Sequence, residues 1–236
     1  MKIAEGLYIE NFASGAQISA KRGGLNIIID TFRASNTILA LLNHVDEVIP
    51  VSTVKEALDM DADIRVGEVR GKMPKGFDVD NSPATIEQLG KQLAGKKVVL
   101  RSTNGTQGLL QSQGAKVTIV ASPRNLTAIV DFASQFQGEV SIVAMGSAIS
   151  GFPLPVPEDT LTAELIASLL LRRSNKTQTG KIDLFSDPSI LESRIFTDLE
   201  YKSTKMSANP KDAPYCLAVD STTVLPVFEN GSLKRL

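Results

Sequence analysis

Two polar loops, each directly after an apolar run, carry the residues of this chain best suited to bind an anion. They lie in IIIDTFRASNTI at 27–38 and LRSTNGT at 100–106. Each combines an arginine and small hydroxyls with the predicted start of a helix, where backbone N–H groups lack partners and the dipole favours negative charge. The predicted substrate-binding residues are Arg33, Ser35, Asn36 and Thr37 in the first loop, Arg101, Ser102, Thr103, Asn104, Gly105 and Thr106 in the second, and Asn81 and Ser82 between them.

Carboxylates near these loops are candidate metal ligands. Asp30 ends the first apolar run, Glu68 follows the short run DIRVG, and Asp78 lies in a glycine-flanked loop. Open α/β sheets carry their reactive groups at the carboxyl ends of strands, and carboxylate oxygens suit Mg²⁺. We therefore expect Asp30, Glu68 and Asp78 to be metal ligands, and Asp30, Arg33, Glu68 and Asn104 to be catalytic residues.

A plainer interpretation stays open for each of these features. STNGT at 102–106 can be an ordinary capped turn, although Gly105 would let the backbone approach a ligand closely. Arg33 can pair with an acidic neighbour at the surface. Asp80-Asn81-Ser82 can simply cap the next helix, which leaves Asp78 solvated. The argument for one shared anion site rests on the presence of both arginine-bearing loops in the same chain.

Composition excludes several classes of function. The formal net charge of −1 gives no basic field for nucleic acid, and the chain has three Tyr, nine Phe and no Trp for base stacking. No apolar run reaches the length of a membrane helix, and the N-terminus lacks the layout of a signal peptide, so we expect a cytoplasmic protein. The single Cys216 and single His44 exclude a zinc cluster, and neither has the neighbours of a catalytic cysteine or a Ser-His-Asp triad.

Apolar, β-branched runs alternate with amphipathic stretches through most of the chain. This alternation predicts an α/β fold, with three α/β/α layers, a mostly parallel or mixed central sheet, and a single domain over 1–236. Ser82-Pro83, Ser122-Pro123 and Pro157-Glu158-Asp159 are helix-start signals. The predicted strands are 25–29, 47–51, 96–100, 116–120 and 139–144, and the predicted helices are 35–43, 53–60, 83–94, 105–113, 123–136 and 158–173.

Three stretches depart from this alternation. Those at 66–82 and 146–157 are rich in Gly and Pro and too long for idle connections, so we expect them to be site loops. The polar segment 174–213 predicts a surface loop and a charged helix around 187–200. The remainder, from 214, predicts one or two closing strands.

Four separated motifs together resemble one known family. DTFRASNTI, GEVRG with GFDVDNSP, STNGT and PEDTL occur in this order within the first 165 residues and are similar to the 2-phosphosulfolactate phosphatase family of the coenzyme M pathway. The resemblance implies a magnesium-dependent acid phosphatase that converts 2-phospho-3-sulfolactate to 3-sulfolactate. The family's motif positions would be Asp30, Arg33, Ser35, Thr37, Glu68, Gly76, Asp78, Asn81, Ser82, Ser102, Asn104, Gly105 and Thr106.

The expected partner is a small anionic phosphoester, with a homo-oligomer left open. Water is the expected final phosphoryl acceptor, reached either directly or through a phosphorylated Asp30. Two alternatives also stay open at this level. One is a non-catalytic module that binds a small phosphorylated or sulfonated metabolite at the same loops. The other is a phosphatase of the same fold that acts on a different phosphorylated hydroxy acid.

Overall fold

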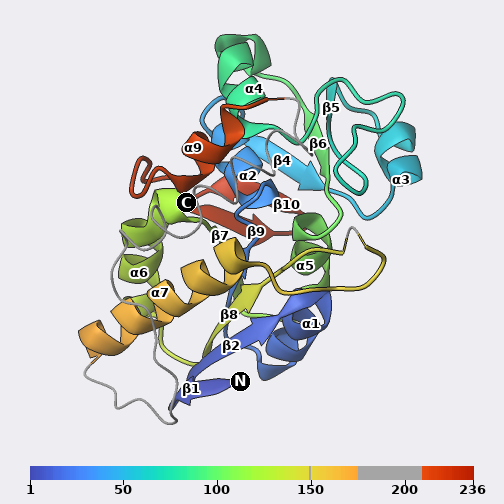
Figure 1. The fold of residues 1–236 in the computed structure, drawn as a ribbon. Helices are drawn as coiled ribbons and strands as arrows, with labels where there is room; N and C mark the ends of the chain where they lie inside the picture. The colour runs from blue at the N-terminus through green and yellow to red at the C-terminus, as the bar shows by residue number, and fades with distance from the viewer. Residues whose placement is uncertain (149, 175–208) are drawn as a thin grey trace.

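The computed structural model describes residues 1–148, 150–174 and 209–236. The charged helix expected around 187–200 lies outside the described residues. Within them, ten strands form one sheet in the order β1-β2-β8-β3-β7-β9-β10-β4-β6-β5 (Figure 1). The strands are β1 Lys2–Ala4, β2 Leu7–Asn11, β3 Leu25–Ile29, β4 Glu47–Pro50, β5 Ile64–Gly67, β6 Val98–Arg101, β7 Val117–Ala121, β8 Val140–Ala144, β9 Pro226–Glu229 and β10 Ser232–Arg235.

The C-terminal hairpin β9–β10 joins two parallel blocks of this sheet. Strands β2, β8, β3 and β7 pair in parallel in one block, and β4, β6 and β5 pair in parallel in the other. The three pairs that connect the blocks, β7–β9, β9–β10 and β10–β4, are antiparallel. Three reversals leave the two blocks running in opposite senses. The predicted mixed sheet and closing strands are therefore confirmed, and the hairpin covers an edge of each block that would otherwise be open.

Helices cover both faces of the sheet. One face carries α1 Phe12–Arg22, α2 Ala34–Leu42, α4 Pro83–Leu89 and α5 Gly105–Gln111, whose apolar side chains share a core that extends across both blocks. On the opposite face, α6 Leu126–Gln135 and α7 Pro157–Ser174 cover the first block, and α3 Val54–Asp59 covers the second. Helix α9 Asp212–Leu217 adds Ala213 and Leu217 to the core of the first block and also packs against α4. Figure 1 shows α6 and α7 across β2 and β8 from α1 and α5. The three-layer prediction is confirmed.

Strand β3 shows why the central runs are apolar throughout. Leu25, Ile27 and Ile29 pack beneath α6 and α7, while Ile28 packs on the face covered by α2 and α5. A strand buried on both faces needs apolar side chains at successive positions. Asn26 is the exception, and its amide group donates to the Ala16 carbonyl and the Ser112 hydroxyl.

Two of the helix-start signals are confirmed in detail. The Ser82 hydroxyl accepts from the Thr85 N–H ahead of Pro83, and the Ser122 hydroxyl accepts from the Arg124 N–H. Two predicted helices are shorter than expected because a 3-10 turn replaces one end. The helix predicted over 83–94 stops at Leu89, before the 3-10 turn Gly90–Leu93, and the one predicted over 123–136 begins with the 3-10 turn Pro123–Asn125.

The elements at the N-terminus were not predicted. Strands β1 and β2 are short and separated only by a turn at Gly6. Helix α1 contains Gly15 and two serines, which lower helix propensity. Among the described residues, no helix has the length and apolar character needed to cross a bilayer.

The position of the hairpin predicts a stability effect. The Leu233 side chain on β10 is fully buried, whereas the neighbouring Lys234 side chain is 64% exposed. We expect Leu233→Ala to lower the free energy of unfolding by about 2–5 kcal/mol, because it leaves a cavity in the core shared by both blocks. Lys234→Ala, which loses only a surface ion pair with Glu47, should cost less than about 1 kcal/mol. Urea unfolding measures both, and equal losses would contradict this role of the hairpin.

Candidate active site

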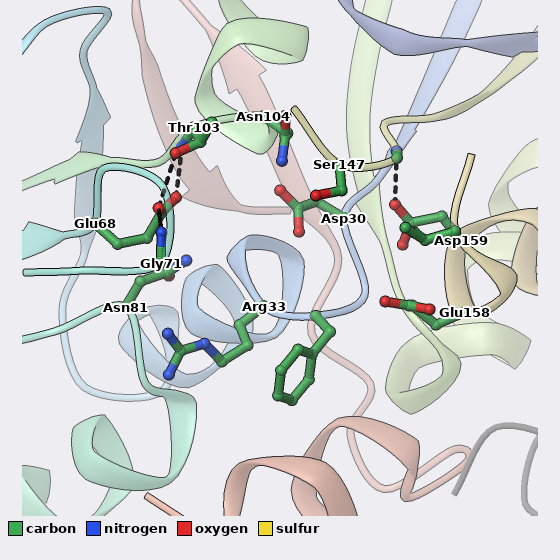
Figure 2. A pocket seen from close by; sticks show the side chains of 13 residues that line it. Asp30, Arg33, Glu68, Gly71, Asn81, Thr103, Asn104, Ser147, Glu158 and Asp159 are labelled. Carbon is green, nitrogen blue, oxygen red and sulfur yellow. Dashed lines mark hydrogen bonds between the residues drawn. The ribbon is translucent and has the colours of Figure 1, made fainter. Parts of the chain in front are cut away.

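A cavity of about 100 Å³ lies where the loops after β3, β5, β6 and β8 meet the start of α7 (Figure 2). Helix α5 follows β6 in the second block but packs against β3 and α2, so it brings the STNGT loop onto the loop that follows β3. Six predicted site residues line the cavity: Asp30, Arg33, Glu68, Asn81, Thr103 and Asn104. Further lining residues that were not predicted are Phe32, Gly71, Gly146, Ser147, Val156, Glu158 and Asp159.

Asp30 lies at the centre of this cavity. Its carboxylate accepts from the backbone N–H groups of Ala34, at 3.3 Å, and of Gly105. Burial, first of all, and the nearby charges of Glu68 and Glu158 together raise the pKa of Asp30 to about 7, although the two N–H donors favour the ionised form. At neutral pH this carboxyl group is therefore close to its midpoint of ionisation.

The STNGT loop does hold anionic groups, but they are carboxylates of the protein itself. The Glu68 carboxylate accepts from the Thr103 N–H at 2.5 Å, the Thr103 hydroxyl at 2.8 Å and the Gly71 N–H at 2.6 Å. The Gly105 N–H donates to Asp30, and the Thr106 N–H donates to the Ser102 hydroxyl. Two backbone N–H groups of the loop, those of Thr103 and Gly105, thus stabilise carboxylates of the site itself, and the Thr106 N–H is taken up by a bond within the loop.

Gly105 is required because of a close approach. A Cβ atom there would lie 2.6 Å from the Ala34 Cβ and 2.9 Å from an Asp30 carboxylate oxygen. Both contacts are shorter than van der Waals distance, and the backbone of Gly105 is not in the left-handed region. The absence of a side chain therefore lets α5 begin against Asp30.

Two adjacent acidic residues at the start of α7 complete the charged wall. Asp159 bridges two loops, because one oxygen accepts from the Thr31 N–H at 2.7 Å and the other from the Gly146 N–H at 2.9 Å. Burial and the proximity of Asp30 and Glu158 raise the pKa of Asp159 well above its ordinary value. Figure 2 shows the carboxylate of Glu158 directed into the cavity, whereas that of Asp159 turns toward Gly146.

Arg33 and Asn81 form a different wall of the cavity. The Arg33 guanidinium pairs with Asp212 at 2.8 Å and lies 3.5 Å from Asp80. The plainer interpretation of Arg33 is thus right about acidic partners, although the pair with Asp212 is buried and not at the surface. The Asn81 side-chain oxygen is buried and has no hydrogen-bond partner within the described part of the chain.

Most of the other predicted substrate-binding residues lie outside the cavity and support its loops. The Ser35 hydroxyl accepts from the Asp30 N–H, the Asn36 amide donates to the Thr31 carbonyl, and Ser102 and Thr106 bond to each other. Arg101 donates to the Glu68 carbonyl. Thr37 is fully buried beneath the loop, and Ser82 caps α4. Their expected contact with a substrate is not supported by these positions.

Of the predicted metal ligands, Asp78 lies outside the cavity. It is exposed and accepts from the Arg65 N–H at 2.7 Å, next to strand β5. Glu68 lines the cavity, but three protein donors engage its carboxylate. The structure thus brings Asp30 and Glu158, and not Asp78, together at this wall.

The sequence is similar, over most of its length, to the members of one protein family. Residues 13–231 match the family model described as 2-phosphosulpholactate phosphatase. The chain belongs to the 2-phosphosulfolactate phosphatase family. Relatives include a 2-phosphosulfolactate phosphatase of Methanothermobacter thermautotrophicus, 30% identical over 90% of each chain, and a probable one of Thermotoga petrophila, 30% identical over 87% of this chain and 89% of the relative. A probable one of Caldanaerobacter subterraneus is 29% identical over 88% of this chain and 89% of the relative.

Membership confirms the family suggested by the motifs and identifies the protein as a phosphoric monoester hydrolase. Glu158 and Asp159 were not among the predicted site residues, although their PEDTL motif contributed to the resemblance. Acidic residues are common in the first turn of a helix because the helix dipole stabilises negative charge there. The sequence therefore contains no separate sign that Glu158 and Asp159 line the cavity. Asp212 carried no signal at all, since it lies far along the chain from the loops it contacts.

The raised pKa of Asp30 predicts how stability depends on pH. Between its unfolded pKa of 3.8 and its folded pKa of about 7, the folded state retains a proton that the unfolded state has lost. The free energy of unfolding of the wild type should therefore fall as pH rises through this window, and Asp30→Asn removes that component. Denaturation in chelator should show the variant gaining stability over the wild type from about pH 4 to pH 7. A difference that does not change with pH would contradict the burial of this charge.

The close approach at Gly105 predicts a combined effect on stability and activity. Gly105→Ala should move α5 away from Asp30, lower the free energy of unfolding by about 1–3 kcal/mol, and reduce phosphatase activity in the protein that remains folded. Gln111→Ala, at an exposed position of the same helix, is the matched control and should leave both unchanged. Thermal melts and activity assays decide. Full activity in folded Gly105→Ala would show that this contact does not position Asp30.

Proposed function

We propose that this protein removes phosphate from 2-phospho-3-sulfolactate to give 3-sulfolactate, with Mg²⁺ bound at the cavity. Family membership supports the reaction class, and the relatives' names support the substrate. The observation that carries the proposal is that one cavity is lined by carboxylates, among them Asp30 and Glu158, and also by Arg33 and Asn81. The carboxylates suit a cation, and the Arg33 and Asn81 side chains suit the anionic groups of a small phosphoester.

The residues present fit magnesium. Among the residues that the structure describes, no group of three or more His, Cys, Asp or Glu side chains forms a metal site by itself. Mg²⁺ is commonly bound by one or two carboxylates together with water and substrate phosphate, so such a group is not required. Asp30 and Glu158 would hold the ion. Burial and the nearby charges of Glu68 and Glu158 raise the pKa of Asp30, and a cation would offset this cost of ionising it.

When bound, the metal would polarise a phosphoryl oxygen and offset its charge. The protein's own residues would do the rest. Arg33 would bind a phosphate or sulfonate oxygen through its planar N–H groups, and Asn81 would offer a side-chain amide beside it. Asp30, held by the Ala34 and Gly105 N–H groups, would keep its carboxylate fixed at the ion.

The alternative of a catalytically silent binding module loses its support, because the chain belongs to a family of phosphatases. A different phosphorylated hydroxy acid as substrate stays a matter for direct assay, since one fold and site can serve several substrates. The cytoplasmic location expected from the sequence also stays a prediction.

The proposal predicts magnesium-dependent phosphate release that needs both wall carboxylates. Purified protein should release phosphate from 2-phospho-3-sulfolactate with Mg²⁺ and lose that activity in excess chelator. Asp30→Asn and Glu158→Gln should each lower kcat/KM by about 100-fold or more while the protein stays folded. Glu164→Gln, the same change on the same helix but outside the cavity, is the matched control and should keep wild-type activity. Full activity in chelator would overturn the metal, and no phosphate release from this substrate would overturn its identity.

A further inference from the structure

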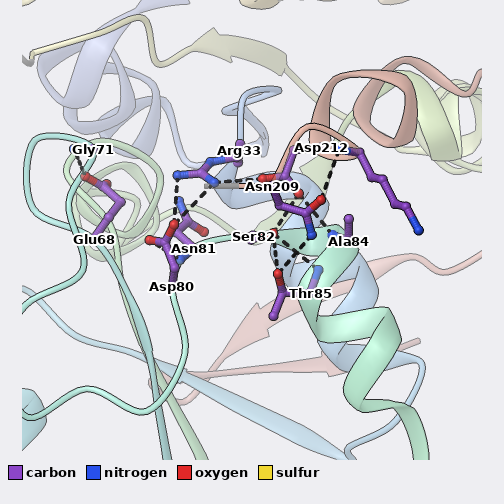
Figure 3. Close-up of polar contacts among 11 residues, drawn as sticks. Arg33, Glu68, Gly71, Asp80, Asn81, Ser82, Ala84, Thr85, Asn209 and Asp212 are labelled. Carbon is purple, nitrogen blue, oxygen red and sulfur yellow. Dashed lines mark hydrogen bonds and ion pairs between the residues drawn. The ribbon is translucent and has the colours of Figure 1, made fainter. Parts of the chain in front are cut away.

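Two carboxylates compete for the Arg33 guanidinium, and they are held very differently (Figure 3). Asp212, the first residue of α9, lies 2.8 Å from the guanidinium, and its side chain is fully buried. Asp80 lies 3.5 Å away, at the long end of an ion pair, and its side chain is 22% exposed. The short, buried contact is the one that determines the direction in which the guanidinium points.

Asp212 is itself fixed by the start of α4. One of its oxygens accepts from the Ser82 hydroxyl at 2.8 Å and from the Ala84 N–H at 3.1 Å. The other oxygen accepts from Arg33. Figure 3 shows Asp212 between Arg33 and the first turn of α4. The Asp212 carboxylate thus links the first turn of α4 to the Arg33 guanidinium at the cavity.

Stability alone does not explain the buried ion pair between Arg33 and Asp212. Taking two opposite charges out of water costs several kcal/mol per ion, and apolar side chains of similar volume often replace a buried pair without loss of stability. The pair joins residues 179 positions apart, and only one of the two, Arg33, lines the cavity. A charge that must keep its direction while it binds an anion is the circumstance in which a fixed carboxylate partner is useful.

We propose that Asp212 is a positioning residue, which holds the Arg33 guanidinium at the cavity wall in the orientation that binds a phosphate or sulfonate group of the substrate. This inference rests on the proposed function, because it assumes that Arg33 binds an anionic group. Asp212 itself does not line the cavity and acts through Arg33.

The test is a double-mutant cycle. Asp212→Asn keeps an oxygen for Ser82 and Ala84 but presents an amide group where Arg33 needs an acceptor. Asp80 stays beside the guanidinium, so its charge is still partly offset. With 2-phospho-3-sulfolactate, kcat/KM should fall about 30-fold in Arg33→Lys and about tenfold in Asp212→Asn. The double variant should be no worse than about threefold below Arg33→Lys, because the aspartate no longer has an arginine to orient.

Tyr215→Phe is the matched control. It removes a 2.6 Å hydrogen bond between α9 and Glu87 of α4 without touching Arg33, so kcat/KM should stay within about twofold of the wild type. If Asp212→Asn keeps the wild-type kcat/KM, or if the two single losses multiply in the double variant, Asp212 does not act through Arg33. If Asp212→Asn does not fold, Asp212→Ser, which leaves room for water, is measured in the same cycle with the same expectations.

A failure of the proposed function would look different. In that case the wild type itself would release no phosphate from 2-phospho-3-sulfolactate. The cycle is then measured as the affinity for inorganic phosphate by calorimetry. The positioning role predicts the same non-additive losses, and additive losses or none would overturn it.

Discussion

The site depends on the burial of one carboxylate, Asp30, at the end of a central strand. An isolated buried charge is costly, so the fold must supply donors, a cation or a proton to stabilise it. The N–H groups of Ala34 and Gly105 supply the donors. Glu68 and Glu158 add further negative charge nearby and increase the demand for a cation. The loops around the cavity supply N–H donors to several of the site's carboxylates.

The loops stabilise these charges with backbone N–H groups that donate to side-chain carboxylates. The loop after β6 holds Glu68 through Thr103, and its helix begins at Gly105 directly against Asp30. Asp159 joins the loops after β3 and β8 through Thr31 and Gly146. Several acidic side chains can thereby lie around one cavity, because each of these carboxylates accepts hydrogen bonds from backbone N–H groups. Arg33 places a positive charge at the same cavity, and we attribute its direction to Asp212.

The parts of the structure that were predictable from sequence are those fixed by local chemistry. Two-sided burial makes β3 a continuous apolar run, and the hydroxyls of Ser82 and Ser122 mark helix starts, so these features could be found without a structure. The insertion of β9–β10 between two blocks could not, because strand order depends on pairings between distant segments. The same holds for the site. Arg33 was identifiable as a charged loop residue, but its partner Asp212 is 179 positions away. The N–H groups of the STNGT loop were expected to hold an anionic group of the substrate, and nothing local shows that those of Thr103 and Gly105 donate to Glu68 and Asp30 instead.

We propose that the carboxylates of Asp30 and Glu158 bind a divalent cation. Crystals grown with Mn²⁺, a substitute for Mg²⁺ with an anomalous signal, test it most directly. We predict an anomalous difference peak within coordination distance of both carboxylates, about 2.0–2.3 Å, and no such peak in Asp30→Asn crystals. A peak elsewhere on the molecule, or a cavity without one at saturating Mn²⁺, would show that these two carboxylates do not bind the ion.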